Sequence, residues 1–171
     1  MSTDPSPTAP RGPAPLALSV VVAQLEAADA TAALEALAAQ LVENGAVTAE
    51  FPAALLARER TYPTGLPTPI PTAIPHADPQ HVLEPGLALA TLAAPVRFGE
   101  MGTADGEVEV GLIAMPLLAD AQEHLAALQA LMGLLSDEAA VAELLEAEDA
   151  DALRERAAVR LAALPASGSA A

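Results

Sequence analysis

The chain has 171 residues, enough for one domain with its own hydrophobic core. Its formal net charge is −16, from 23 acidic and 7 basic residues. This balance argues against nucleic acid or an anionic membrane surface as a partner, because both require clustered cations. The sequence has no cysteine, which excludes a disulfide framework, a thiolate metal site and a thiol nucleophile.

The two ends of the chain have a different composition from the middle. Residues 1–15 are rich in Pro, Ser and Thr, and we expect them to form a disordered N-terminal tail. Residues 165–171 are expected to form a shorter disordered tail, which leaves one domain at 16–164. No signal-peptide pattern is visible, and no apolar run reaches the roughly 18 residues that a spanning helix needs. We therefore expect a cytoplasmic protein.

The domain begins with a predicted strand and a predicted helix. Ser19-Val20-Val21-Val22-Ala23 is short and β-branched, as strands are. Residues 30–44 carry apolar side chains at helical spacing and end at Asn44-Gly45, where glycine can take the left-handed conformation that closes a helix.

A second helix is predicted over 50–60, and the residue that continues its apolar stripe is Arg58. The pattern leaves two interpretations open. Arg58 could extend to solvent past the end of an apolar face, or it could point inward toward an anion. Glu59 and Arg60 fall off the stripe and are predicted to be solvated.

A proline-rich stretch follows, with six prolines from Pro63 to Pro79, which exclude a long helix. Ile74 precedes Pro75 and should therefore be extended. Such a segment loses less entropy on ordering than a glycine-rich loop would. We predict a rigid loop that presents His76.

The second half of the chain reads as strands and then helices. Residues 87–92 and 107–115 are predicted strands, and the second becomes apolar throughout, as if it were covered on both faces. Asp120 and Glu123 resemble a capping box at the start of a helix, and Ser136 is the predicted cap of the next. A last helix is expected over 149–161. The stripe predicted to be buried in the first of these helices is Leu125, Leu128, Leu131, Met132 and Leu135. Strands mixed with helices of this length indicate an α/β layered domain.

His76 and His124 are candidate functional residues by position. His124 lies in the first turn of a predicted helix, where the macrodipole disfavours imidazolium and should keep the ring neutral. If the two histidines converge, an anion between them would meet imidazole, helix N–H groups and Arg58. A lone histidine is more often a surface or structural residue, so neither carries this prediction by itself.

Other chemistries find less support in the sequence. His76, Asp78 and His81 could form a metal site, since imidazole and carboxylate suit zinc, but their spacing matches no known motif. His81 also fits a solvated turn. No G-x-S-x-G elbow, Walker A loop or dinucleotide-binding glycine fingerprint is present.

Several motifs follow one another in order. They are Arg58-Glu59-Arg60-Thr61-Tyr62-Pro63-Thr64-Gly65-Leu66, Ala73-Ile74-Pro75-His76, Pro95-Val96-Arg97-Phe98 with Met101-Gly102, and Glu123-His124-Leu125 ahead of Leu128-Gln129-Ala130-Leu131-Met132. Together they resemble the enzyme IIA domains of the bacterial sugar phosphotransferase system, in the fructose–mannitol superfamily and its galactitol-type branch. The resemblance covers about residues 16–164. The segment 67–71 is more proline-rich than this family leads us to expect.

This resemblance implies a cytoplasmic phosphocarrier with a mixed β-sheet and helices on both faces. His76 would accept a phosphoryl group from phospho-HPr and pass it to enzyme IIB, which phosphorylates a sugar as the membrane enzyme IIC imports it. His124 and Arg58 would stabilise the phosphate. Donor and acceptor would dock in turn over His76, on a shallow apolar rim to which Ile74 and Ala77 could contribute. The resemblance implies no cofactor, no metal and no nucleic-acid partner.

Two alternatives stay open. A regulatory protein of the same fold, like the nitrogen-branch enzyme IIA, would use the phosphorylation of its histidine to control partner proteins. A catalytically inactive binding module is the other. The sequence does not identify the sugar, for which a galactitol-like substrate is one option.

Overall fold

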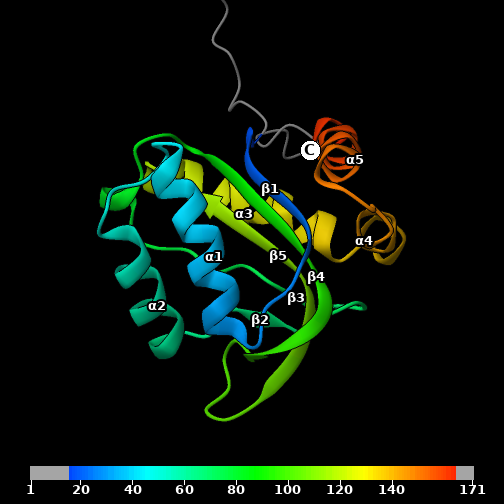
Figure 1. Ribbon diagram of the computed structural model, residues 1–171, viewed down its shortest axis with the longest axis horizontal. Coiled ribbons are helices and arrows are strands. Elements are labelled where there is room, and N and C mark those ends of the chain that lie inside the picture. Colours follow the sequence, from blue (N-terminus) through cyan, green and yellow to red (C-terminus); the bar gives the residue numbers. More distant parts are fainter. Residues whose placement is uncertain (1–15, 165–171) are drawn as a thin grey trace, which may run out of the picture.

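The computed structural model describes residues 16–164, apart from the side chains of residues 121–124 (Figure 1). The predicted tails, 1–15 and 165–171, lie outside the described residues. The described part is one α/β domain, as predicted.

A mixed sheet of five strands forms the centre of the domain, in the order β1-β4-β5-β3-β2. Its strands are β1 (Leu18–Leu25), β2 (Gly65–Leu66), β3 (Thr72–Ala73), β4 (Gly86–Gly99) and β5 (Glu107–Leu117). β1 runs parallel to β4 and β3 runs parallel to β5, while β4–β5 and β2–β3 are antiparallel. The two short strands β2 and β3 were not predicted, and the proline-rich residues 67–71 connect them.

Within residues 16–164, five α-helices cover both faces of this sheet. They are α1 (Ala30–Glu43), α2 (Phe51–Thr61), α3 (Ala121–Leu135), α4 (Glu138–Leu145) and α5 (Ala150–Ala162), and a short 3-10 helix, η1 (Pro79–His81), lies between β3 and β4. Helices α1 and α2 pack on one face and α3, α4 and α5 on the other (Figure 1). The prediction of helices on both faces is confirmed.

The central strands face a core on each side. Leu87 and Leu89 of β4 pack toward α3–α5, whereas Ala88 and Ala90 pack toward α1 and α2. The later half of β5 is buried on both faces in the same alternating way. This double burial explains why the sequence of β5 stops alternating. Each leucine buried in these layers stabilises the fold by about 1.5–3 kcal/mol.

Aspartates begin three of the helices. Asp29, Asp137 and Asp149 each accept a hydrogen bond from a backbone N–H of the first turn of α1, α4 and α5. The prediction of Ser136 as the cap of α4 is therefore wrong by one residue. Asp137 has the extended backbone that a cap requires, and its carboxylate receives the Ala140 N–H at 3.1 Å.

Two other details differ from the sequence predictions. Leu125 is 63% exposed, so the buried stripe of α3 begins later and includes Leu134. β4 continues to Gly99, seven residues beyond the predicted strand, through a register irregularity between Thr91 and Val96. The predicted capping box at Asp120 depends on the side chain of Glu123, which lies outside the described residues.

Within residues 16–164 no single helix is long and apolar enough to cross a membrane. Leu125–Leu135 and Glu138–Leu145, which meet at a bend of 81°, pass the same length and composition test only as a pair.

Candidate functional site

The sheet topology brings the two candidate histidine segments to one edge. β3 pairs in parallel with β5, with Ala73 opposite Ile113. The carboxyl ends of these two strands therefore point the same way, toward the edge where α/β sheets commonly bind ligands. His76 follows β3 by three residues, and His124 lies in the first turn of the helix that follows β5. The side chain of His124 lies outside the described residues.

The ring of His76 is partly buried and is oriented by its own loop. Its Nδ1 lies 2.9 Å from the carbonyl oxygen of Ile74. Because a carbonyl oxygen can only accept, this contact requires Nδ1 to carry the hydrogen. In the neutral ring the lone pair is then on Nε2. The loop thus selects the tautomer whose lone pair is on Nε2.

The backbone that carries this carbonyl is fixed from both sides. The Ile74 N–H donates to the Thr64 carbonyl oxygen at 3.3 Å, and Pro75 restricts the residue that precedes it. Ile74 is only 4% exposed and Ala77 only 7%. The predicted apolar rim of Ile74 and Ala77 is therefore wrong, because both side chains belong to the interior of the domain. They hold the loop in place.

Arg58, in the last turn of α2, contacts the loop of His76. Its Nη1 donates to Asp78 Oδ1 at 3.1 Å, and its Cζ lies 5.6 Å from the centre of the Tyr62 ring. Its Nε is buried and has no hydrogen-bond partner among the described residues. A buried guanidinium N–H without an acceptor is unfavourable. An anionic oxygen would satisfy this N–H, which agrees with the interpretation that Arg58 points inward toward an anion.

Glu59 lies beside this arrangement and is not identified by the helical periodicity of the sequence. It was predicted to be solvated together with Arg60, but only Arg60 is exposed. The Glu59 carboxylate accepts hydrogen bonds from the N–H and the hydroxyl of Thr64. Burial raises its pKa above the ordinary value, although the Thr64 hydrogen bonds act in the opposite direction. One sequence signal was available, since the helix dipole disfavours an acid in the last turn unless a local donor compensates.

His81 lies in η1, apart from this arrangement. Its Nδ1 is 3.4 Å from the Thr48 hydroxyl, and its carbonyl accepts the Thr48 N–H at 2.9 Å. The His76–Asp78–His81 metal site finds no support, since no three His, Cys, Asp or Glu residues in the described part of the chain are grouped to hold a metal ion.

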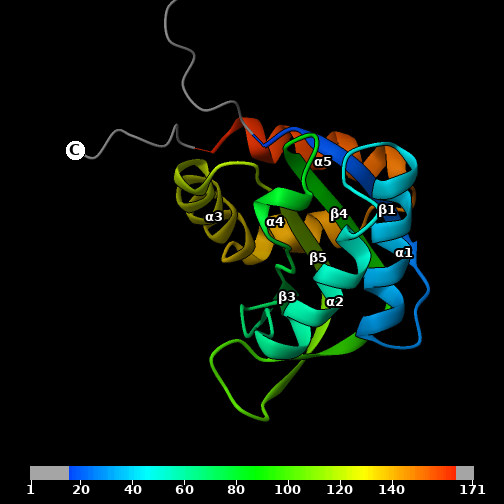
Figure 2. The same cartoon turned by 90° about the vertical axis from the view of Figure 1, so that its left-hand side faces the viewer.

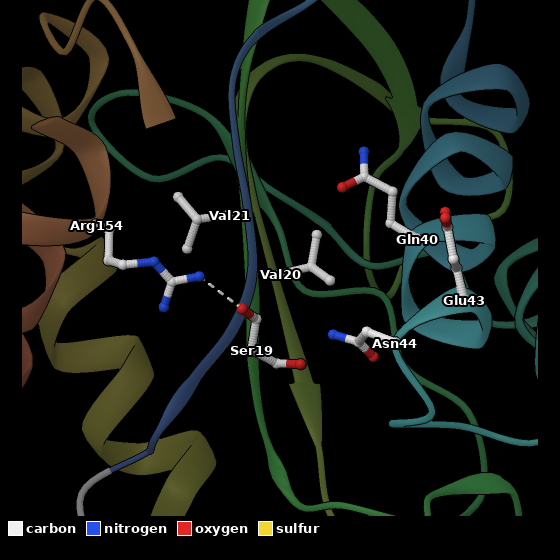
Figure 3. A pocket seen from close by; sticks show the side chains of 7 residues that line it. All are labelled: Ser19, Val20, Val21, Gln40, Glu43, Asn44 and Arg154. Carbon is white, nitrogen blue, oxygen red and sulfur yellow. Dashed lines mark hydrogen bonds between the residues drawn. The ribbon is translucent and has the colours of Figure 1, made fainter. Parts of the chain in front are cut away.

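A surface pocket of about 430 Å³ lies elsewhere, along the outer edge of β1 (Figure 3). It lies between α1 and α5, and Arg154 closes part of the strand edge by donating to the Ser19 carbonyl at 2.7 Å. The lining residues are Ser19, Val20, Val21, Gln40, Glu43, Asn44 and Arg154. None of them is a candidate site residue, so this pocket is separate from the site at His76.

Comparison with known proteins places these features in a family. The sequence profile described as "Phosphoenolpyruvate-dependent sugar phosphotransferase system, EIIA 2" matches residues 16–157. None of the curated protein sequences compared with the chain matches it significantly.

Solved structures similar to this chain include proteins from two functional groups. The crystal structure of mannitol IIA from Escherichia coli is 27% identical, with a TM-score of 0.63, and the match covers 78% of this chain and 92% of that one. Nitrogen regulatory protein IIA-Ntr from Neisseria meningitidis is also 27% identical, with a TM-score of 0.65 and coverage of 81% and 94%. An NMR structure of mannitol enzyme IIA in complex with phosphorylated enzyme IIB from Escherichia coli matches at 27% identity, TM-score 0.65, with coverage of 80% and 92%.

Proposed function

The chain belongs to the EIIA 2 family of the phosphoenolpyruvate-dependent sugar phosphotransferase system, and we propose that His76 is the residue through which it carries a phosphoryl group. Phospho-HPr is the donor and an enzyme IIB is the acceptor. The observation that carries this assignment is the hydrogen bond from His76 Nδ1 to the Ile74 carbonyl. It leaves the Nε2 lone pair as the nucleophile on a neutral ring.

The transfer exchanges one P–N bond for another. The Nε2 lone pair of His76 attacks the phosphorus of the donor phosphohistidine as the P–N bond of the donor breaks. A donor ring protonated on its second nitrogen leaves as neutral imidazole with the electron pair of the broken bond. The His76 ring then carries phosphorus on Nε2 and hydrogen on Nδ1 and is cationic. Its hydrogen bond to the Ile74 carbonyl becomes charge-assisted, and no other base is needed.

Arg58 and His124 complete the proposed site as donors to the phosphoryl oxygens. The support for Arg58 is its position against Asp78, two residues after His76, with a buried Nε that lacks an acceptor among the described residues. The support for His124 is the topology, which places its helix start at the carboxyl end of β5, beside β3. Positioning and stabilisation of the equatorial oxygens do most of the work in such a transfer.

Donor and acceptor must dock in turn over His76, so the interface has to be transient. Tyr62, which lies against Arg58, is 65% exposed, and Leu125, next to His124 in the chain, is 63% exposed. We propose these two side chains as the apolar rim in place of Ile74 and Ala77. The formal charge of −16 favours partners that have basic surfaces.

We propose a role in carbohydrate uptake, with reaction partners in the cytoplasm and indirect contact with the membrane through enzyme IIC. The Tyr62-Pro63-Thr64-Gly65-Leu66 and Met101-Gly102 motifs favour the transport branch, for which a galactitol-like substrate is one option. The regulatory alternative has its own support, because the IIA-Ntr structure is as similar in sequence as mannitol IIA.

Incubation with enzyme I, HPr and phosphoenolpyruvate tests the site. We expect an acid-labile phosphate on His76, no labelling of His76→Ala, and full labelling of the control His81→Ala. His124→Ala should mainly impair transfer. Full labelling of His76→Ala would refute the assignment. Onward transfer to an enzyme IIB indicates transport, and its absence with every enzyme IIB encoded beside this chain indicates regulation.

A further inference from the structure

Glu59 and Thr64 form a compact hydrogen-bonded unit at the end of α2. The carboxylate accepts the Thr64 N–H at 2.9 Å and the Thr64 hydroxyl at 3.1 and 2.8 Å from its two oxygens. Thr64 is 3% exposed. Its buried N–H and hydroxyl therefore both depend on one carboxylate, because water has little access to them.

The chain of contacts continues from Thr64 to the His76 ring. The Thr64 carbonyl accepts the N–H of Ile74 at 3.3 Å, and the Ile74 carbonyl accepts the His76 Nδ1–H at 2.9 Å. Next to this link, Gly65 pairs with Ala73 across β2 and β3. The position of the Ile74 carbonyl is thus set through Thr64, and Thr64 is held by Glu59.

In the described part of the chain, the hydrogen bonds from Thr64 are the only interactions found for the Glu59 carboxylate. None of the ion pairs found there includes it, since the neighbouring Arg58 pairs with Asp78 instead. A partly buried carboxylate without a cation is unfavourable unless hydrogen bonds compensate. Among the residues that the structure describes, all the donors that compensate the Glu59 carboxylate belong to Thr64.

From these contacts we propose that Glu59 is a positioning residue for His76, which acts through Thr64 and Ile74 to fix the ring in the tautomer with its hydrogen on Nδ1. The inference rests on the proposed function, because a fixed tautomer serves catalysis only if His76 accepts the phosphoryl group. Without the carboxylate, the Thr64 N–H and hydroxyl would lack acceptors. The backbone at Thr64 would then shift so that these groups could bind water. The Ile74 carbonyl would move with it, and the ring would sample both tautomers.

Two substitutions test the link without removing the nucleophile. Glu59→Gln keeps the side-chain volume but loses the charge and one acceptor oxygen. Thr64→Val keeps the backbone N–H and loses the hydroxyl, while Thr64→Ser restores the hydroxyl. Glu50→Gln, at the exposed start of the same helix, is the matched control.

The first readout is the ¹⁵N spectrum of the His76 ring in the full chain, recorded at a pH at which the spectrum itself shows the ring to be neutral. We expect wild type, Thr64→Ser and Glu50→Gln to show the Nδ1–H tautomer. Glu59→Gln and Thr64→Val should show a mixture. A purely structural role would lower the melting temperature and leave the tautomer unchanged, which would overturn the proposal.

The second readout is the rate of labelling by enzyme I, HPr and phosphoenolpyruvate. Glu59→Gln and Thr64→Val should each slow it by about tenfold, and the double variant should be no slower than the slower single one, because both break the same chain of contacts. If the rate losses of the two single variants add up in the double variant, Glu59 and Thr64 do not act through one chain of contacts. If Glu59→Gln does not fold, the comparison of Thr64→Val with Thr64→Ser decides. A wild type that is not labelled refutes the proposed function, whereas the tautomer measurement stands independently of it.

Discussion

Gly65 lies so close to Gly99 that it has no room for a side chain. A Cβ on Gly65 would lie 2.6 Å from the Gly99 carbonyl oxygen and 2.7 Å from Val108 Cγ2. The Gly65 carbonyl also accepts the Met101 N–H at 2.8 Å. The segment from Thr64 to His76 is therefore joined at Gly65 to the turn end of the β4–β5 hairpin, which projects from the end of the sheet (Figure 2).

Gly65→Ala should destabilise the domain by about 1–3 kcal/mol, because the clash is with backbone and cannot be relieved by a rotamer change. It should also slow phosphoryl acceptance, since β2 and the Thr64 carbonyl would move together. The matched control is Gly133→Ala in α3, where a Cβ meets nothing within 4 Å. That variant should gain about 0.5–1 kcal/mol from helix propensity. Urea unfolding measures the free energy of unfolding of both variants. An unchanged free energy in Gly65→Ala would contradict the close approach of Gly65 to Gly99.

Arg58→Lys tests whether the guanidinium geometry matters beyond its charge. Lysine can pair with Asp78 but has no Nε and cannot present two parallel donors to a phosphoryl group. Loss of such a donor should reduce the rate of phosphoryl acceptance by about 100-fold. Arg60→Lys is the control, because Arg60 is exposed on the same helix and its Nε donates to the Leu56 carbonyl. Equal rates for wild type and Arg58→Lys would show that only the positive charge is needed.

Asp78→Asn probes how Arg58 is held. Their ion pair is at the surface, with side chains 36% and 63% exposed, so its loss should change the free energy of unfolding by less than about 1 kcal/mol. Phosphoryl acceptance should fall by about fivefold, because the guanidinium loses its anchor at Nη1. In an Arg58→Ala background, Asp78→Asn should not change the rate of phosphoryl acceptance. A faster rate in Asp78→Asn would instead mean that Asp78 competes with the phosphoryl group for Arg58.

The sequence predicted the elements whose signals are local. The apolar spacing of α1 and the change from alternating to continuous apolar residues in β5 each follow from neighbours on one element. The strands β2 and β3 have two residues each and exist because Gly65 pairs with Ala73 and Thr72 with Leu112. Such pairing between distant segments leaves no periodic pattern in a stretch this short.

The site, like the fold, could be predicted only in part from the sequence. His76 was identified from its motif, but the roles of its surroundings depend on how α2 ends. The Tyr62 N–H donates to the Arg58 carbonyl and closes the helix, and the chain then turns so that Thr64 meets Glu59. Helical periodicity assigned Glu59 to solvent because it describes only the helix itself. The acceptor for Thr64 becomes visible only when the chain beyond the helix is placed.

Glu59 also gives the domain a pH dependence whose sign can be derived. Burial raises its folded-state pKa above the ordinary value of 4.5. The folded state therefore binds more protons than the unfolded state from about pH 4.5 up to the raised pKa, and the free energy of unfolding contributed by this group falls as the pH rises through that window. Below the window the contribution is fully present, and above it the ionised, buried carboxylate is a constant cost.

Glu59→Gln removes this titration, so the difference between the unfolding free energies of wild type and variant isolates it. We expect that difference, wild type minus Glu59→Gln, to decrease as the pH rises above about 4.5 and to level off once the pH exceeds the raised pKa of Glu59. Urea unfolding at a series of pH values measures it, with Glu50→Gln run alongside to give the slope of an exposed glutamate at the start of the same helix. A difference that increases with pH would mean that the three hydrogen bonds from Thr64 outweigh desolvation and that the folded-state pKa lies below 4.5.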